Sequence, residues 1–394
     1  MNTRVMLGSA ILLTTLVLFA GCGGGDSPSG PGNGGSTPNI TSILPSGAAP
    51  GIPIQIKGAN FDSAPGTVTV GGSAATVASW SPTEVACTIP QGLPQVIGIS
   101  VELTTAAGKT AQSTIDITPP HTYRVTDTSA MDHYPCWSGG GDWIYFSSVL
   151  PGSSNWDIYR IPATGGVATR VTFDDEPDFY PDMNFSSGEL AWSSQMTHVN
   201  NSDNDYEVFY GFPDCLQPGS GCTISMLTRN TSRDLDPAWA RTVHAGYELA
   251  YTHEDTLPSG SFAAWKVWLH SNTGTVELTE GRQPGFSPDG TWVVFNHEDN
   301  IYKVPTTGGT PEQLTDTDHD WYPNWGPDDR IVFQRTNGAT AEDIFVMNAD
   351  GSGVAPMVNT PNYEYCPSWS PDGKKVVYYA NVMGQFNIYV YVVP

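Results

Sequence analysis

The sequence has few basic residues. It holds 16 Lys and Arg against 40 Asp and Glu, and the formal net charge of its 394 residues is −24. A protein surface this acidic repels phosphate backbones and anionic lipid head groups. The composition therefore argues against nucleic-acid binding.

The sequence is also poor in the residues that favour helices. Gly (42) and Pro (32) are abundant, and 12 Trp and 17 Tyr accompany them. These residue types favour short strands joined by turns. The hydrophobic content of 39% is still enough for packed cores. We therefore expect an all-β protein of two to three domains and exclude all-α and Rossmann-type folds.

Two chemical signatures are missing from the chain. There is no Cys-x-x-Cys pair, so a cysteine-based metal site is not expected. There is also no Gly-x-Ser-x-Gly elbow, so the serine chemistry of α/β-hydrolases is not expected.

The first 21 residues predict a secretory signal peptide, because an apolar run from Val5 to Gly21 follows Arg4. The exit from this run, Leu18-Phe19-Ala20-Gly21-Cys22, resembles the lipobox of bacterial lipoproteins. The resemblance implies cleavage before Cys22 and a lipid on its thiol, and Gly23 in place of Asp favours the outer membrane. A simple transmembrane anchor is the alternative. The Gly-, Ser- and Pro-rich remainder of residues 22–38 predicts a flexible tether.

Residues 39–118 predict a small immunoglobulin-like sandwich, with strands over 52–57, 67–70, 85–89, 97–103 and 113–117. Alternation places Val85, Cys87 and Ile89 on one face, and we expect Cys87 to be a buried free thiol. The segments Ile43–Gly47 and Ile54–Phe61 resemble the opening of the IPT/TIG family, and Val68–Gly72 and Cys87–Pro90 resemble its middle. The resemblance implies a spacer or interaction module.

Residues 121–394 contain six repeats, each with an acidic residue (Gly281 in the fourth), two variable residues, Pro, one residue and a large apolar side chain. We call this pattern the anchor. The anchor prolines are Pro135, Pro181, Pro237, Pro284, Pro323 and Pro367, spaced 46, 56, 47, 39 and 44 residues apart. This period is typical of four-stranded propeller blades. The last repeat lacks its final strand, and we expect residues 121–127 to supply it and close the ring.

The repeats resemble those of TolB-like propellers, whose members bind partner proteins or precede peptidase domains.

Four of the remaining cysteines are expected to pair in an oxidising compartment. Cys215 and Cys222 bracket a short loop that a disulfide would stabilise. Cys136 and Cys366 follow and precede the first and last anchor prolines, and a second disulfide between them would join the two ends of the ring.

Two rings of candidate site residues follow from the anchors. The acidic ring has either a structural role, capping backbone N–H groups of the turn, or binds a cation such as calcium. The position after the acid varies from blade to blade, which favours binding of a partner loop or a sugar; ordinary inter-blade packing is the alternative. The acidic ring is Asp132, Asp178, Asp234, Asp320 and Glu364, interrupted at Gly281. The candidate binding ring is His133, Phe179, Leu235, Arg282, Trp321 and Tyr365.

One segment offers a weaker calcium signal, and no other cofactor is expected. Residues 201–207 resemble half of a calcium-binding loop, but the loop lacks Gly at its sixth position and has Phe212 where the twelfth-position acid belongs.

Our leading hypothesis is a non-catalytic lipoprotein of the cell envelope, held at the membrane by its N-terminal lipid. Its propeller would bind a protein or a cell-wall glycan. One alternative is a polysaccharide lyase or glycosidase that uses His133 and His319 or the ring carboxylates. A purely structural surface protein is the other.

Overall fold

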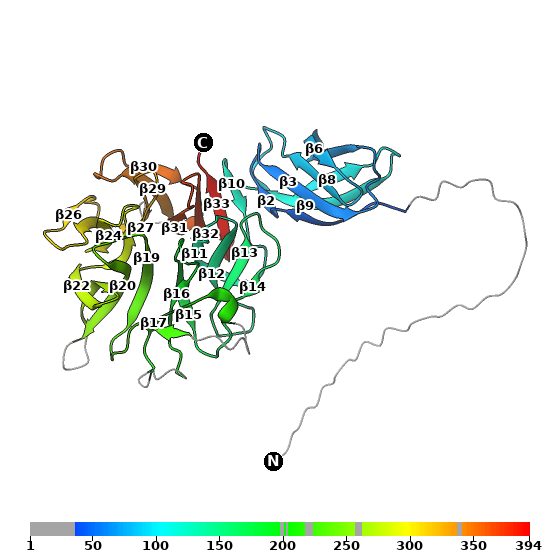
Figure 1. The fold of residues 1–394 in the computed structure, drawn as a ribbon. Helices are drawn as coiled ribbons and strands as arrows, with labels where there is room; N and C mark the ends of the chain where they lie inside the picture. Colours follow the sequence, from blue (N-terminus) through cyan, green and yellow to red (C-terminus); the bar gives the residue numbers. More distant parts are fainter. Residues whose placement is uncertain (1–35, 198–200, 202–203, 217–223, 257–261, 337–340) are drawn as a thin grey trace, which may run out of the picture. The chain divides into compact units, whose positions relative to one another are not determined.

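The computed structural model describes residues 36–197, 201, 204–216, 224–256, 262–336 and 341–394 (Figure 1). Its regular structure is β throughout, apart from one 3₁₀ turn, η1, at Pro213–Cys215. The expected signal peptide, the lipid-bearing Cys22 and nearly all of the tether lie outside the described residues. In the part that the structure describes, no helix is long and apolar enough to cross a membrane.

The first folded part is a sandwich of two sheets. One sheet has the strand order β1 (Asn39–Leu44), β3 (Pro53–Ala59), β7 (Glu84–Thr88) and β6 (Thr76–Trp80). The other has β2 (Gly47–Ala48), β9 (Thr110–Ile117), β8 (Val96–Thr104), β4 (Thr67–Val70) and β5 (Ser73–Ala74). Val85, Cys87 and Ile89 are all buried between the sheets, and Cys87 is a free thiol, as predicted.

Six four-stranded blades follow. Blade 1 has β11 (Met131–Trp137), β12 (Trp143–Val149), β13 (Asp157–Pro162) and β14 (Thr169–Arg170). Blade 2 has β15 (Asp178–Met183), β16 (Leu190–Ser194), β17 (Glu207–Gly211) and β18 (Ser225–Met226). Blade 3 has β19 (Asp234–His244), β20 (Tyr247–Thr256), β21 (Phe262–Ser271) and β22 (Gly274–Glu280).

Blades 4 to 6 repeat this order. Blade 4 has β23 (Arg282–Phe286), β24 (Trp292–His297), β25 (Asn300–Pro305) and β26 (Glu312–Gln313). Blade 5 has β27 (Asp320–Trp325), β28 (Arg330–Thr336), β29 (Glu342–Asn348) and β30 (Ala355–Val358). Blade 6 has β31 (Tyr363–Trp369), β32 (Lys375–Val382) and β33 (Gln385–Val392), and it takes its outer strand, β10 (Thr122–Arg124), from the beginning of the repeat region.

The pairing of β10 with β33 confirms the predicted closure. Tyr123 lies opposite Val390, and the innermost strands contact one another in the closed cycle β11, β15, β19, β23, β27, β31 and back to β11. The other edge of β10 pairs with β2, so blade 6 and the second sandwich sheet form one nine-stranded sheet. Arg124 strengthens this junction through an ion pair with Asp116 at 2.8 Å.

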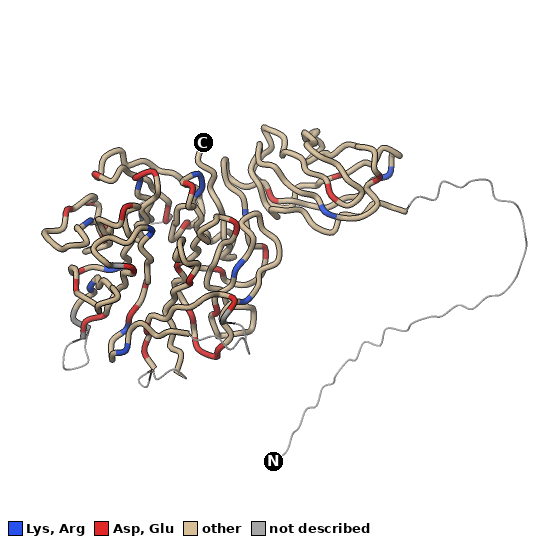
Figure 2. The backbone as a smooth tube through the Cα atoms, in the orientation of Figure 1, with Lys and Arg blue, Asp and Glu red and all other residues tan. Residues whose placement is uncertain are grey.

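The large apolar residue that ends each anchor is aromatic in every blade but the second, where it is Met183. Trp137 and Trp369 are almost fully buried, and the indole N–H of Trp137 donates to the carbonyl oxygen of Ser368 at 3.1 Å, across the seam of the ring. Acidic residues are spread over the strands and loops of the propeller, and basic residues are sparser (Figure 2). The blades are therefore held together mainly by apolar packing.

Candidate functional site

The anchor proline creates the same irregularity in every blade. Each innermost strand shifts register around it, as between His133 and Cys136 in β11, because proline has no N–H to donate to the ladder. The residue before each proline adopts a left-handed conformation, with φ between 47° and 56°, although none of the six is glycine. We call these residues the upper tier: Tyr134, Tyr180, Asp236, Gln283, Tyr322 and Cys366.

Three tyrosines of the upper tier meet on the propeller axis. The ring of Tyr134 lies 4.3 Å from that of Tyr180 and 6.2 Å from that of Tyr322. Burial raises the pKa of Tyr134 to about 12, although hydrogen bonding with the other two tyrosines partly offsets this effect. Burial also raises the pKa values of Tyr180 and Tyr322, so all three tyrosines stay neutral at physiological pH.

A cavity of about 140 Å³ lies next to the tyrosines, on the side where the innermost strands end. The residues after the anchor prolines line it, and most of them are small. We call them the lower tier: Cys136, Asp182, Ala238, Gly285, Asn324 and Ser368. Since one enclosed water needs roughly 10–15 Å³ on this scale, the cavity can hold several waters or one small ligand.

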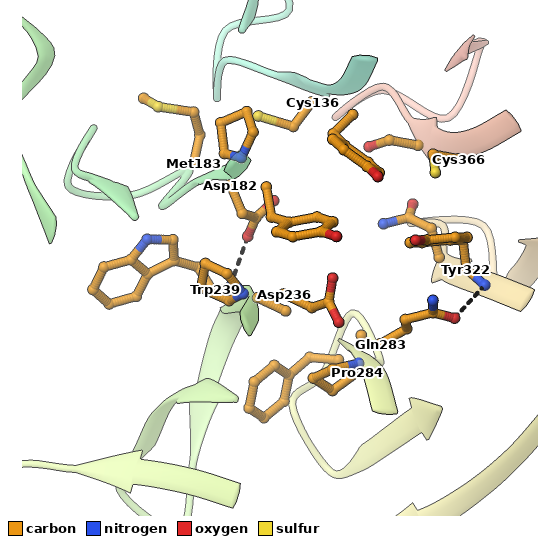
Figure 3. A pocket seen from close by; sticks show the side chains of 18 of the residues that line it. Cys136, Asp182, Met183, Asp236, Trp239, Gln283, Pro284, Tyr322 and Cys366 are labelled. Carbon is orange, nitrogen blue, oxygen red and sulfur yellow. Dashed lines mark hydrogen bonds between the residues drawn. The ribbon is translucent and has the colours of Figure 1, made fainter. Parts of the chain in front are cut away.

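Hydrogen bonds between blades fix the polar side chains around the cavity (Figure 3). Asp182 accepts the backbone N–H of Trp239 at 2.7 Å, and the side-chain oxygen of Gln283 accepts that of Tyr322 at 3.0 Å. The side-chain oxygen of Asn324 accepts the backbone N–H of Trp369 at 2.9 Å, which leaves its amide N–H groups to face the cavity. These polar side chains are thus held in place by hydrogen bonds that also join neighbouring blades.

Two carboxyl groups in the cavity wall have raised pKa values. Burial raises the pKa of Asp182 to about 7, against smaller lowering effects from the Trp239 N–H and the charge of Arg241. Burial also raises the pKa of Asp236 to about 6, although the hydroxyl of Thr252 donates to it at 3.0 Å. Both groups therefore change protonation near neutral pH.

The cation of the cavity is Arg241. It occupies the position where blades 4, 5 and 6 place the proline of a tight turn, so the blade architecture does not require it. Its guanidinium lies over the ring of Phe185 at 4.9 Å, and its Nη1 has no hydrogen-bond partner in the described part of the chain. Burial lowers its pKa to about 10, although Asp182 and Asp328 oppose this effect.

The acidic ring lies inside the blades rather than on an open surface. All five carboxyl groups are buried, at 0–1% exposure. Asp132 accepts from the hydroxyl of Ser148 at 2.6 Å, and Asp320 binds Arg335 through two hydrogen bonds of 2.6 and 2.8 Å. For Asp132 and Asp320 the donors are side chains of the same blade, whereas Glu364 accepts from the hydroxyl of Thr360, in the segment between blades 5 and 6. This geometry favours the structural role.

The candidate binding ring lies on the other side of the tyrosines, at the end where the innermost strands begin, which we call the mouth. The ring of His133 is stacked on Tyr379 at 4.6 Å, and Tyr379 is stacked on Tyr365 at 4.9 Å. Trp156 bridges His133 and Phe179, with centroid distances of 4.8 and 5.2 Å. Blades 6, 1 and 2 therefore contribute one continuous aromatic cluster.

Arg282 and Trp321 form a separate pair on blades 4 and 5. The guanidinium of Arg282 and the indole N–H of Trp321 both donate to the same Asp299 oxygen, at 2.9 Å each. Leu235 of blade 3 is half-buried. The six predicted positions thus share one end of the propeller but not one contact network.

Exposed apolar side chains extend the aromatic cluster at the mouth. Met131 and Leu150 flank the first hairpin of blade 1, and Tyr363 and Met383 occupy the corresponding end of blade 6. We call these four residues, together with the half-buried aromatic side chains and His133 next to them, the mouth patch. Its members are Met131, Leu150, Tyr363, Met383, His133, Trp156, Phe179, Tyr365 and Phe386.

The predicted Cys136–Cys366 disulfide is wrong. Both residues are buried free thiols, because Cys366 belongs to the upper tier and Cys136 to the lower tier. Cys136 packs with Met183 and Trp192 in the core between blades 1 and 2, whereas Cys366 belongs to a different cluster. The expected Cys215–Cys222 bridge involves Cys222, which lies outside the described residues.

No cluster of three or more His, Cys, Asp or Glu side chains suited to a metal ion occurs among the described residues. Asp203 of the calcium-like segment 201–207 lies outside them; in the remainder, the amide of Asn201 donates to the carbonyl oxygen of Asp205 at 2.7 Å. Neither finding favours the cation alternative for the acidic ring.

Sequence reasoning identified the anchors but missed both tiers. Only the acid and the variable position after it were considered as site residues, and the residues on either side of the proline, which line the cavity, were not. The signal was present, since a proline inside a central strand marks a break in the ladder. Arg241 carried a signal too, because it departs from the turn sequence of the other blades.

Comparisons with known proteins agree with this architecture. Residues 38–117 match the IPT/TIG domain family, so the first folded part is an IPT/TIG domain. An uncharacterized protein of Agrobacterium fabrum is 31% identical over 186 residues, and the match covers 41% of this chain and 60% of that relative. The chain therefore matches less than two thirds of this relative's length.

Among solved structures, an auxiliary nutrient binding protein from Bacteroides thetaiotaomicron is 12% identical, with a TM-score of 0.47 over 90% of this chain and 97% of that one. TolB from Acinetobacter baumannii is also 12% identical, with a TM-score of 0.46 over 76% of this chain and 78% of that one. At these levels of identity and similarity, neither match indicates a function.

Proposed function

We propose that this protein is a non-catalytic lipoprotein of the cell envelope whose propeller binds a partner protein through the mouth patch. The observation that carries the proposal is the set of exposed apolar side chains on adjoining blades 6 and 1. The other exposed large apolar side chains of the propeller are mostly valines, scattered over loops, the end of β19 and the outer strand β22. An exposed apolar group that continues into an aromatic cluster is typical of an interaction surface.

Met383 supports this reading most strongly. It is 85% exposed and has a φ of 54° in the two-residue turn between β32 and β33. Such turns favour Asn or Gly, and a bulky side chain there is strained. Methionine is flexible and enriched at protein interfaces, so a binding role explains its presence. Tyr363 beside it supplies a rigid aromatic anchor of the kind found at binding hot spots.

The acidic ring favours binding over glycoside hydrolysis. A glycosidase needs two carboxyl groups that reach the scissile bond. Asp132 and Asp320 point into their own blades and are bound there by Ser148 and Arg335. The aromatic surface above them retains the features of a contact surface, for which a protein is the first candidate and a cell-wall glycan the second.

Site-specific photo-crosslinking in cells tests the proposal. A photoreactive amino acid replaces Tyr363 in one strain and Val276 in another, since these positions are similarly exposed, at 40% and 43%. We expect one discrete protein adduct at position 363, its loss in a Met131→Ala/Met383→Ala background, and no adduct at position 276. Equal adducts at both positions, or none at position 363, would refute the mouth patch as the binding surface.

The lipid anchor is tested separately, on the full-length protein. A clickable fatty acid should label the wild type and leave Cys22→Ser unlabelled, and membrane fractionation should place the wild type in the outer membrane. Labelling that survives the Cys22→Ser substitution would contradict the proposed lipid attachment at Cys22. It would leave the proposal about the mouth patch unaffected.

A further inference from the structure

The cavity below the tyrosines contains a cation, Arg241, that forms no ion pair with any residue that the structure describes. Arg241 reaches the cavity from β19, and its Nη1 is enclosed without a hydrogen bond in the described part of the chain. Burying a charge without a partner is costly unless something in the site compensates for it. The nearby acids do not pair with it directly: Asp182 is oriented by the backbone N–H of Trp239, and Asp328 by its ion pair with Arg330 at 2.5 Å.

Other donors face the same cavity from the opposite blades. The side-chain oxygen of Asn324 is occupied by the Trp369 N–H, so its amide N–H groups are available to a ligand. Ser368, one blade further, adds a hydroxyl to the cavity wall. The cavity wall thus presents the guanidinium of Arg241, the amide of Asn324 and the hydroxyl of Ser368.

We propose that the axial cavity binds a small monocarboxylate, with Arg241 as its counter-ion and Asn324 and Ser368 as further hydrogen-bond donors. The planar fork of a guanidinium matches the two oxygens of a carboxylate. The cavity volume of about 140 Å³ restricts the ligand to a few non-hydrogen atoms. Arg241 is the one cationic side chain among the described residues that line the cavity, so it balances a single negative charge, and a monoanion is favoured over phosphate or a dicarboxylate.

This site is independent of the proposed function at the mouth. Tyr134, Tyr180 and Tyr322 lie between the two: all three line the cavity, and Tyr134 contacts Phe179 of the mouth patch, whereas no member of that patch lines the cavity. A small carboxylate can therefore occupy the cavity whether or not a partner protein occupies the mouth. The two proposals also fail separately in the experiments below.

Ligand-observed NMR titration of the purified full-length protein tests the site. Acetate and propionate are the probes, acetamide is the neutral isostere of acetate, and phosphate tests the anion class. We expect acetate and propionate to bind at least about tenfold more tightly than acetamide, since charged hydrogen bonds are the stronger ones. Acetamide equal to acetate, phosphate binding in place of carboxylate, or no binding of either carboxylate would overturn the proposal.

Variants localise the binding. Arg241→Met keeps the packing of the stem on Phe185 and removes the charge, and it should weaken acetate binding by about tenfold or more. The matched control is Arg160→Met, because Arg160 also lies over an aromatic ring, Trp143, at 5.1 Å but outside the cavity. Acetate affinity that is unchanged in Arg241→Met, or equally reduced in Arg160→Met, contradicts the assignment.

A second variant keeps the test decisive if Arg241→Met does not fold. Asn324→Asp preserves the acceptor for the Trp369 N–H but replaces the amide donor with a negative charge. We expect it to lose acetate binding by more than tenfold, and this loss should exceed any loss of acetamide binding. Wild-type acetate affinity in Asn324→Asp would refute the proposed donor set.

Discussion

The mouth and the cavity lie on the two sides of the same tyrosines, and the same anchor sequence builds both, yet their chemistry is opposite. At the mouth, His133, Phe179 and Tyr365 pack as an aromatic cluster that continues into exposed apolar side chains. In the cavity, Asp182, Asn324 and Arg241 surround a small polar space. The mouth suits a large partner with its own apolar surface, whereas the cavity suits a small charged ligand.

The difference comes from where each side chain stands relative to the anchor proline. The residues two places before the proline lie at the mouth, the residue directly before it fills the axis, and the residue after it lines the cavity. Because the bulge is the same in every blade, only the side chains at these three positions differ. One repeated backbone can therefore carry two unrelated sites.

The largest expected effect comes from removing the barrier between the two regions. Tyr134→Ala deletes the ring that contacts both Tyr180 and Tyr322. We expect the free energy of unfolding to fall by about 3–5 kcal/mol, as for other buried aromatic residues replaced by alanine. Tyr134→Phe keeps the ring and should cost about 1 kcal/mol. Urea denaturation of both variants measures this, and equal losses would show that the hydroxyl, not the ring, closes the axis.

The sandwich, the six blades and the closing strand could be predicted from the sequence, because their signals are periodic. The two tiers could not, since they depend on which way a bulge turns each side chain. Cys136 and Cys366 illustrate this limit: they look equivalent beside their prolines, but one follows and the other precedes its proline, so they belong to different tiers. The exposure of Met383 also depends on the turn geometry, which the sequence pattern left open.

The cavity should respond to rising pH. The pKa of Asp182 is about 7 in the folded protein against an ordinary value of 3.8, so the folded state holds this proton more tightly than the unfolded state. Its contribution to stability is present below pH 3.8 and is lost as the pH rises toward 7. Asp182→Asn should therefore match the wild type at pH 4 and exceed it by about 2–4 kcal/mol at pH 8. Denaturant midpoints at the two pH values provide the measurement, and a variant less stable than the wild type at pH 8 would contradict this account.

The mouth should respond to falling pH, and by less. Burial among aromatic rings lowers the pKa of His133 to about 4 from an ordinary value of 6.5. The folded state therefore favours the neutral imidazole, and this contribution is present above pH 6.5 and is lost as the pH falls toward 4. The free energy of unfolding of His133→Phe minus that of the wild type should therefore be about 2 kcal/mol larger at pH 5 than at pH 7.5. Parallel pH dependences of variant and wild type would show that His133 is not enclosed in this way.

The most direct test of the central claim, that the channel carries two separate sites, is the photo-crosslink yield from position 363 in two further backgrounds. Arg241→Met alters only the cavity, and Tyr365→Ala alters only the mouth patch. We predict that the yield in Arg241→Met equals that of the parent strain and that the yield in Tyr365→Ala falls by at least about tenfold. An equal loss of yield in both backgrounds would contradict the account, because it would mean that the mouth and the cavity act as one site.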